Sequence, residues 1–169
     1  MADGVFGLEV VTPEQSLFAG GARAVVLATS EGALTVLDGH TPLVGDVTHC
    51  EVRVEDAEGS ELHLAVHGGF LQVDTSPGAA AGLAEEGDGP LPGLSTRVTV
   101  LAGVAELASE IDVPRAEQAR DRAAQRVGEL GSGRGQVAEG VEEDLELAEA
   151  EGALARAELR LAVAAGTAA

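Results

Sequence analysis

Hydrophobic and polar residues follow one another along the first two thirds of the chain in short runs typical of β-strands. Strands are expected at residues 5–12, 22–29, 33–37, 51–54, 61–67 and 97–102, where β-branched residues gather or polar and apolar positions alternate. Turn signals punctuate the first five runs, at Glu31-Gly32, Asp38-Gly39, Glu58-Gly59 and Gly68-Gly69. This spacing predicts an antiparallel β-sandwich over residues 1–110.

The segment 75–95 interrupts this pattern. It holds five glycines, three prolines and three acidic residues. Such a composition does not bury enough apolar surface to fold by itself. We therefore expect a flexible loop inserted between two strands rather than a domain boundary.

The hydrophobic period changes to three and four residues beyond Asp112, as in an amphipathic helix. Pro114 suits a first helical turn, with Asp112 or Val113 as the cap. One stripe consists of Ala116, Ala119, Ala123, Val127 and Leu130, and the glycines at 131, 133 and 135 are expected to end that helix. A second helix is expected over residues 141–165, with a stripe at Leu147, Ala150, Leu154, Ala157, Leu161 and Ala164. The two stripes predict an antiparallel two-helix hairpin over residues 111–169.

The hairpin is expected to be weakly held. Its stripes are built largely from alanine, and each methylene that alanine lacks forgoes about 0.8 kcal/mol of burial. Elements with little buried apolar surface are the ones that move.

Composition narrows the class of partner. The net charge is −19, and tryptophan and tyrosine are absent, so nucleic acid and anionic membrane surfaces are poor partners. No apolar run approaches the roughly 20 residues that span a bilayer, and the first residues do not resemble a secretory signal. The single cysteine, Cys50, excludes an internal disulfide and suits a reducing compartment.

Arginine supplies all ten basic residues, and seven of them follow residue 111. Arg115, Arg122 and Arg126 fall on one helical face, and Arg156 and Arg160 lie one turn apart on the second helix. Converging guanidinium groups suit phosphates or carboxylates of a partner. The alternative is a solvated helix face with local ion pairs.

Catalytic and metal-binding patterns are not found in the sequence. His63 and His67 share a side of a strand but stand about 13 Å apart, and His49 and Cys50 face opposite sides. No P-loop is present, and His67-Gly68-Gly69 is expected to be a hairpin turn because no Gly-x-Ser-x-Gly motif follows it. We expect no catalytic residue, no metal and no required cofactor.

Several motifs together resemble the epsilon subunits of bacterial F-type ATP synthases. They occur in that family's order, at residues 11–14, 17–20, 31–37, 39–43, 67–71, 98–102, 106–108 and 111–112. The resemblance implies a central-stalk rotor subunit that couples proton flow to ATP synthesis. It also implies the gamma subunit, the c-ring and the alpha/beta catalytic head as partners, at the cytoplasmic side of the cell membrane, where other subunits hold it.

The resemblance also implies where the partners bind. Contacts with the c-ring and gamma are expected at Glu31, Gly39, His40, Thr41, Pro42 and Leu43. Glycine and proline give that loop a fixed exposed turn. For His40 the alternative is a loop residue that hydrogen-bonds to local backbone.

Some members of the family bind ATP in the folded hairpin as a regulatory ligand. Their motif is similar to residues 111–116 here, and the matching positions are Glu106, Asp112, Arg115, Ala116, Arg122, Arg156 and Arg160. Members also inhibit ATP hydrolysis through basic residues of the hairpin. The second helix begins with Glu142, Glu143 and Asp144, so we expect only weak inhibition.

Two other functions are left open. A free-standing nucleotide-sensing module would use the same arginines without gamma or the catalytic subunits. An enzyme would need a nucleophile with its base, or a metal cluster, at useful spacing.

Overall fold

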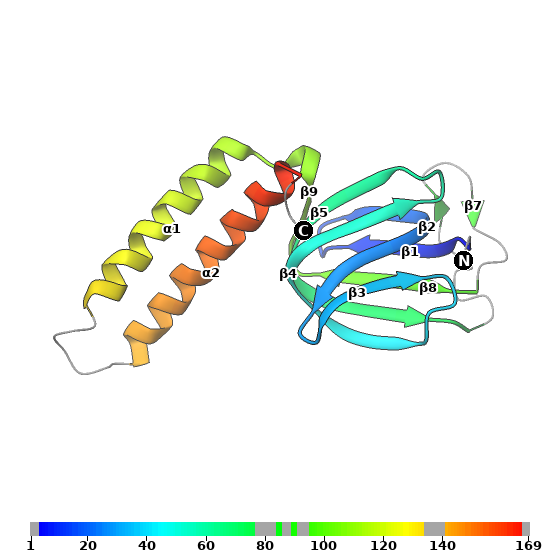
Figure 1. Cartoon of the computed structure of the whole chain (residues 1–169), viewed down its shortest axis with the longest axis horizontal. Coiled ribbons are helices and arrows are strands. Elements are labelled where there is room, and N and C mark those ends of the chain that lie inside the picture. Colours follow the sequence, from blue (N-terminus) through cyan, green and yellow to red (C-terminus); the bar gives the residue numbers. More distant parts are fainter. Residues whose placement is uncertain (1–3, 77–83, 86–88, 91–94, 134–140, 167–169) are drawn as a thin grey trace. The chain divides into compact units, whose positions relative to one another are not determined.

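The computed structural model describes residues 4–76, 84–85, 89–90, 95–133 and 141–166. It divides into two compact units, Met1–Ala108 and Ser109–Ala169, which are described separately here (Figure 1). The first unit is β-rich and the second consists of two helices. This is the sandwich followed by a helical hairpin that the sequence predicts.

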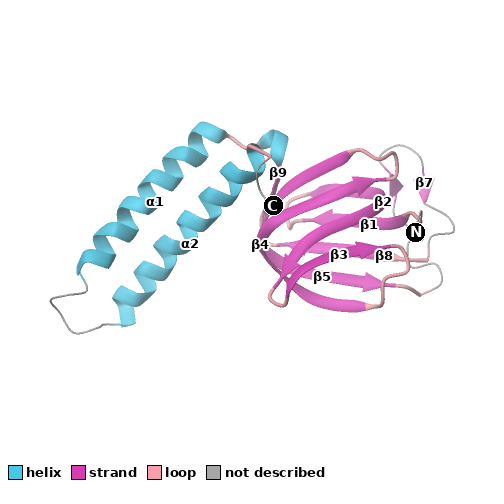
Figure 2. Cartoon of the chain, in the orientation of Figure 1, coloured by secondary structure: helices cyan, strands magenta, loops and turns pink. Residues whose placement is uncertain are grey.

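The first unit contains a seven-stranded β-sheet. Its strands are β1 (Phe6–Val11), β2 (Ser16–Thr29), β3 (Gly32–Leu37), β4 (Leu43–Asp56), β5 (Glu61–Asp74), β8 (Arg97–Ala102) and β9 (Ala105–Leu107). A separate two-stranded pair joins β6 (Ala84–Glu85) to β7 (Gly89–Pro90), and a short 3-10 helix covers Ala108–Glu110. Figure 2 shows the strands wrapped around a common interior.

The seven-stranded sheet closes on itself. Its paired strands run from β1 through β8, β5 and β4 to β2, and β2 pairs again with β1. The β1–β8 pair is parallel, and the other strand pairs of this sheet are antiparallel. Strand β3 pairs only with β2 in the described part of the chain, so it forms an edge.

The core of the first unit is made mainly of aliphatic side chains, with Phe6 among them, because the sequence has almost no aromatic residues. Inward positions alternate with outward ones along each strand. The fully buried side chains of largest volume are Phe6, Leu8, Leu64, Leu71 and the valines 10, 25, 36, 52, 54, 66, 98 and 100. Valine is well suited to such positions, since its branched side chain packs on a pleated surface.

The turn expected at Gly68-Gly69 is not formed. Strand β5 continues to Asp74, and its two halves pair with different strands. Leu64, Ala65 and Val66 pair with β9, whereas residues from Gly69 onward pair with β8. Gly68, with φ of +86°, lies where the strand passes between these two pairings. The two glycines mark a kink inside a continuous strand. Local composition does not distinguish such a kink from a turn between two strands.

Strands β2 and β4 are also longer than expected. Each has 14 residues, as β5 does, whereas the sequence predicted eight or fewer. Pairing with distant strands extends them through glycines and polar residues that weaken the local pattern. The expectation of a flexible loop at residues 75–95 lies largely outside the described residues.

The second unit contains α1 (Val113–Gly133) and α2 (Val141–Ala164), which pack side by side. Asp112 caps α1, and the helix passes Gly131 to end at Gly133, the second of the three glycines expected to stop it. The buried residues of the two helices include Ala116, Ala123, Leu147, Ala150 and Ala157, all from the predicted stripes. Val163 is also buried and was not expected. Neither helix in the described part of the chain is long and apolar enough to cross a membrane.

Candidate functional site

Residues 39–43 include most of the loop between β3 and β4 and the first residue of β4, and local hydrogen bonds hold the first half of this segment. The His40 amide donates to the Leu37 carbonyl at 3.1 Å, and Gly39 has a φ of +75°, which favours glycine. The His40 Nδ1 lies 2.8 Å from the carbonyl oxygen of Thr41. That contact is the local bond left open as the alternative for His40. Gly39, Thr41 and Pro42 are exposed, whereas His40 and Leu43 are half-buried.

Glu31 lies at the other end of β3, in the tight turn that follows β2. It is exposed, and its amide donates a hydrogen bond to the Thr29 hydroxyl oxygen at 3.2 Å. Asp46 of β4 holds the same turn, since its two carboxylate oxygens accept from the amide and hydroxyl of Ser30 at 3.1 and 2.7 Å. These bonds lower the pKa of Asp46, with the Ser30 hydroxyl as the main cause.

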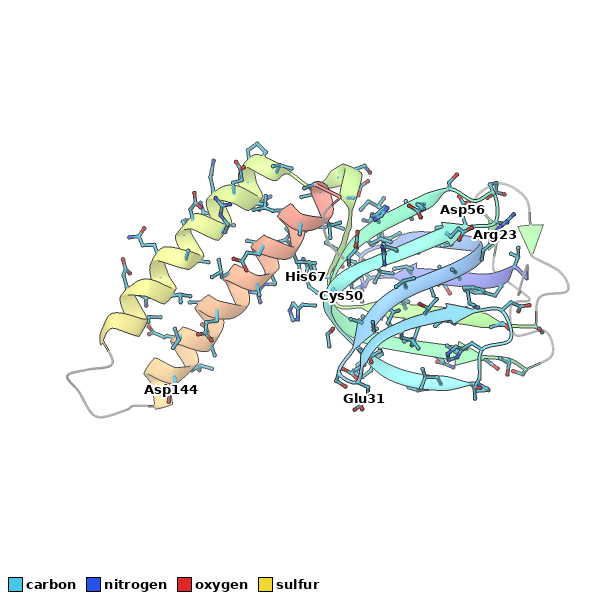
Figure 3. The ribbon with its side chains drawn as sticks, viewed as in Figure 1. Arg23, Glu31, Cys50, Asp56, His67 and Asp144 are labelled. Carbon is cyan, nitrogen blue, oxygen red and sulfur yellow. The ribbon has the colours of Figure 1, made fainter. Side chains whose placement is uncertain are left out.

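The structure therefore separates the two parts of the expected ring contact. Strand β3 between them advances roughly 17 Å at 3.3 Å per residue. Figure 3 shows Glu31 at one end of the first unit and Arg23 and Asp56 at the opposite end. Along β3 itself, Ala33, Thr35 and Leu37 are exposed. The six residues thus belong to one edge of the domain and not to one compact patch.

An apolar surface that the sequence reasoning missed lies on the outer side of β1, β8 and β5. Val11, Leu101 and Phe70 are consecutive cross-strand neighbours. Phe70 is 61% exposed and Leu101 is 49% exposed. A hollow of about 530 Å³ adjoins them, lined by residues 11–13, 67–70 and 101–103.

The alternation of inward and outward side chains along β5 was the signal that would have revealed this surface. Leu71 and Val73 point inward, so Phe70 must point outward once the strand continues past Gly69. A turn at Gly68-Gly69, as the sequence predicts, would end the strand before Phe70, so the alternation of inward and outward side chains would not extend to it.

Asp112, Arg115 and Ala116 are brought together at the start of α1. The Asp112 carboxylate accepts from the Arg115 amide at 3.0 Å, and the Asp112 carbonyl accepts from the Ala116 amide at 2.9 Å. Ala116 is buried in the hairpin stripe, whereas the Arg115 side chain is exposed. The motif therefore has a structural role as a helix cap, independent of any ligand.

The remaining arginines differ in their surroundings. Arg126 pairs with Glu146 of α2 at 2.7 Å and with Glu129 at 3.9 Å, the latter through its second guanidinium nitrogen. Arg122 is exposed, Arg160 is half-buried, and the exposed Arg156 passes over Gly152. The local ion pairs of Arg126 match the alternative of a solvated helix face. Glu106 lies in β9, in the first unit, so the expected ATP-binding set is divided between the two units.

Histidine and cysteine side chains give no sign of metal or nucleophilic chemistry. The described residues contain no group of three or more potential metal ligands. His63 Nδ1 lies 2.7 Å from a carboxylate oxygen of Glu51, and the rings of His49 and His67 are 5.9 Å apart. Burial raises the pKa of the Cys50 thiol, which opposes formation of the reactive thiolate.

Comparison with known proteins covers both units. Residues 5–77 match the family model of the ATP synthase delta/epsilon chain, beta-sandwich domain. Residues 109–165 match that of the ATP synthase delta/epsilon chain, long alpha-helix domain. The fold also resembles a chain in the structure of Euglena gracilis mitochondrial ATP synthase (OSCP/F1/c-ring), with a TM-score of 0.65 and 18% identity over 92% of this chain and 78% of that one.

Curated relatives agree with the family models. The ATP synthase epsilon chain of Desulforapulum autotrophicum is 36% identical over 163 residues, which are 96% of this chain and 97% of the relative. Those of Brevibacillus brevis and Thermobifida fusca are 35% and 40% identical, over 72% and 66% of this chain and 77% and 69% of their own lengths. The chain therefore belongs to the ATP synthase epsilon-chain family.

Proposed function

We propose that the chain acts as the epsilon subunit in the central stalk of a bacterial proton-translocating F-type ATP synthase. The observation that carries this proposal is the match to epsilon chains across both units, the sandwich and the hairpin. In that role it is an accessory subunit that carries out no reaction itself. Its place is at the cytoplasmic side of the membrane, held there by other subunits.

The exposed edge along β3 is suited to the c-ring. It extends from Glu31 through Ala33, Thr35 and Leu37 to the loop at 39–43, with a row of outward-facing backbone groups. A ring of identical subunits presents a broad surface, which an edge roughly 17 Å long touches at more than one point. This proposal retains all six expected contact residues while placing them along one edge.

The apolar surface formed by Val11, Leu101 and Phe70 is suited to gamma. Exposed aromatic and aliphatic side chains next to a hollow are typical of the centre of a protein interface. This surface is at the C-terminal end of β8, whereas the 39–43 loop lies beside the residue that precedes β8. The loop is therefore about one strand length from this surface, which lets two partners bind at once. Glu31, at the other end of β3, lies closer to it, because Asp46 is the cross-strand neighbour of Phe70 and holds the Glu31 turn.

Cross-linking in the assembled enzyme tests these contacts. Single cysteines are introduced by Glu31→Cys, Thr41→Cys or Phe70→Cys in a Cys50→Ala background. The first two are expected to cross-link to subunit c and the third to gamma. Glu58→Cys is the matched control for the ring, because Glu58 is exposed in the turn that follows β4, at the opposite end of that strand from Leu43. Adducts with c from Glu58→Cys but not from Thr41→Cys would refute the assignment.

ATP as a regulatory ligand of the hairpin is a separate part of the proposal. Its support is the exposure of three arginines, Arg115, Arg122 and Arg156, on helices that also carry the family-like motif. Calorimetric titration of the purified chain with ATP is expected to give saturable binding that Arg122→Ala weakens. Absence of saturable binding at millimolar ATP would refute it, without affecting the stalk assignment.

A further inference from the structure

Thr96 is the buried polar residue in an otherwise apolar interior. Its exposed fraction is 0%, and it is the one polar or charged residue classed as buried in the described part of the chain. Burying a hydroxyl costs free energy unless it is hydrogen-bonded. A valine of nearly the same shape would fill the same space without burying a hydroxyl. Packing alone therefore does not account for threonine at this position.

The Thr96 hydroxyl uses both of its hydrogen-bonding capacities on the connection between β3 and β4. It accepts from the Gly39 amide at 3.0 Å and donates to the Asp38 carboxylate at 2.9 Å. Its backbone carbonyl accepts from the Gly7 amide of β1 at 3.0 Å. One residue thus joins the start of β8, the strand β1 and the first two residues after β3.

The surroundings leave this connection little freedom. A Cβ added to Gly4 would collide with the Asp38 carboxylate, so the N-terminal segment closes over the side of Asp38. Gly39 adopts a left-handed φ of +75°, and the His40 amide is bonded to Leu37. Three consecutive residues, Asp38, Gly39 and His40, are consequently fixed just before the exposed Thr41 and Pro42.

We propose that Thr96 is a positioning residue for the ring-facing loop: through Asp38 and Gly39 it sets where Thr41 and Pro42 stand. The proposal rests on the proposed function, in which this loop contacts the c-ring. It adds that a residue nearly 60 positions away in the sequence, with no exposed atoms of its own, controls that contact. Thr96 and Asp38 act on the ring only through the loop.

Hydrogen exchange of the full chain tests the local part of this proposal. Thr96→Val removes both side-chain bonds and keeps the volume, whereas Thr96→Ser keeps the hydroxyl. In Thr96→Val the Gly39 amide is expected to exchange roughly fivefold faster relative to the core amide of Val66, the factor that corresponds to one ordinary hydrogen bond. Thr96→Ser is expected to restore the wild-type ratio. Equal acceleration at Gly39 and Val66 would mean a purely global loss of stability and would overturn the proposal.

Cross-linking of assembled complexes tests its consequence for the ring. In the Thr41→Cys, Cys50→Ala background, adding Thr96→Val is expected to reduce the yield of adduct with c severalfold, whereas Thr96→Ser keeps it. Val66→Ala, a buried substitution in another part of the core, is the control for general destabilisation and is expected to keep the yield.

The outcomes of these experiments distinguish failure of the positioning role of Thr96 from failure of the proposed contact with the c-ring. An unchanged yield in Thr96→Val, or an equal loss in Val66→Ala, overturns the positioning role. If Thr41→Cys gives no adduct with Thr96 intact, the ring contact of the proposed function is wrong. The exchange ratio then still decides whether Thr96 holds the loop.

Discussion

Gly69 is the position at which the sandwich is expected to tolerate a side chain least. Strands β5 and β8 approach each other closely there, and a Cβ would lie against the Leu101 carbonyl oxygen, well inside van der Waals contact. The obstacle is the main chain of a paired strand, so rotation of a side chain does not relieve it. Gly69→Ala must therefore displace β8 or distort β5.

Three glycine-to-alanine substitutions form a graded series. Gly45 has nothing within 4 Å of an added Cβ and no positive φ, so Gly45→Ala should be neutral or stabilising by up to about 1 kcal/mol. Gly68 has a φ of +86° but its nearest atom is 3.7 Å away, so Gly68→Ala should cost about 1–2 kcal/mol in backbone strain. Gly69→Ala adds steric overlap and should cost about 3 kcal/mol.

Native-state hydrogen exchange of the full chain measures these free energies of unfolding. The amides of Val66, Leu71 and Val98 are suitable because these residues are in the buried core of the sandwich. Circular dichroism is less suitable because the helices of the second unit dominate its signal, and the chain has no tryptophan or tyrosine for intrinsic fluorescence. If Gly69→Ala is no more destabilising than Gly68→Ala, the close approach to Leu101 does not restrict this position and the reasoning fails.

Three other predictions concern the turn, the cap and the hairpin. The pKa of Asp46 is lowered in the folded state, so its contribution to stability is present above the ordinary value of 3.8 and is lost as pH falls through the lower folded value. Asp46→Asn should flatten that part of an acid-unfolding curve, and an unchanged curve would contradict this. Asp112→Ala removes the cap of α1 and should cost about 1 kcal/mol of local stability, seen as faster exchange in the first turn and not in α2. Removal of residues 112–169 should change the ATPase activity of the assembled enzyme only modestly, because acidic residues begin the second helix; strong activation would contradict this.

The hairpin was largely predictable because its signal is local. The alanine stripes fix which face of each helix is buried, and Asp112 with Pro114 marks the first turn. A helix satisfies its backbone within its own segment, so sequence periodicity suffices. Val163 was missed because the predicted stripe placed Leu161 and Ala164 on either side of it.

The sandwich was predictable in class but not in detail. The pairing partners of a strand are distant in sequence, and β9 is only three residues long, too short to give a periodic signal. The same reason explains the missed extension of β5 beyond Gly69 and the missed apolar surface around Phe70. The ring-contact residues follow from a resemblance between sequence motifs, which does not reveal that β3 sets Glu31 and Gly39 at opposite ends of one edge.

The long strands β2, β4 and β5 bear on how the first unit responds to force. Strands β2 and β5 each change partners along their length, and β4 pairs with β5 from Leu43 to Glu55 and with β2 only near its C-terminal end. Sliding one side of the sandwich past the other would therefore break backbone hydrogen bonds that continuous strands make with their neighbours. It would not simply shift side chains across an apolar interface between two separate sheets. A stalk component built this way resists shear and transmits torque between its two ends as a stiff block.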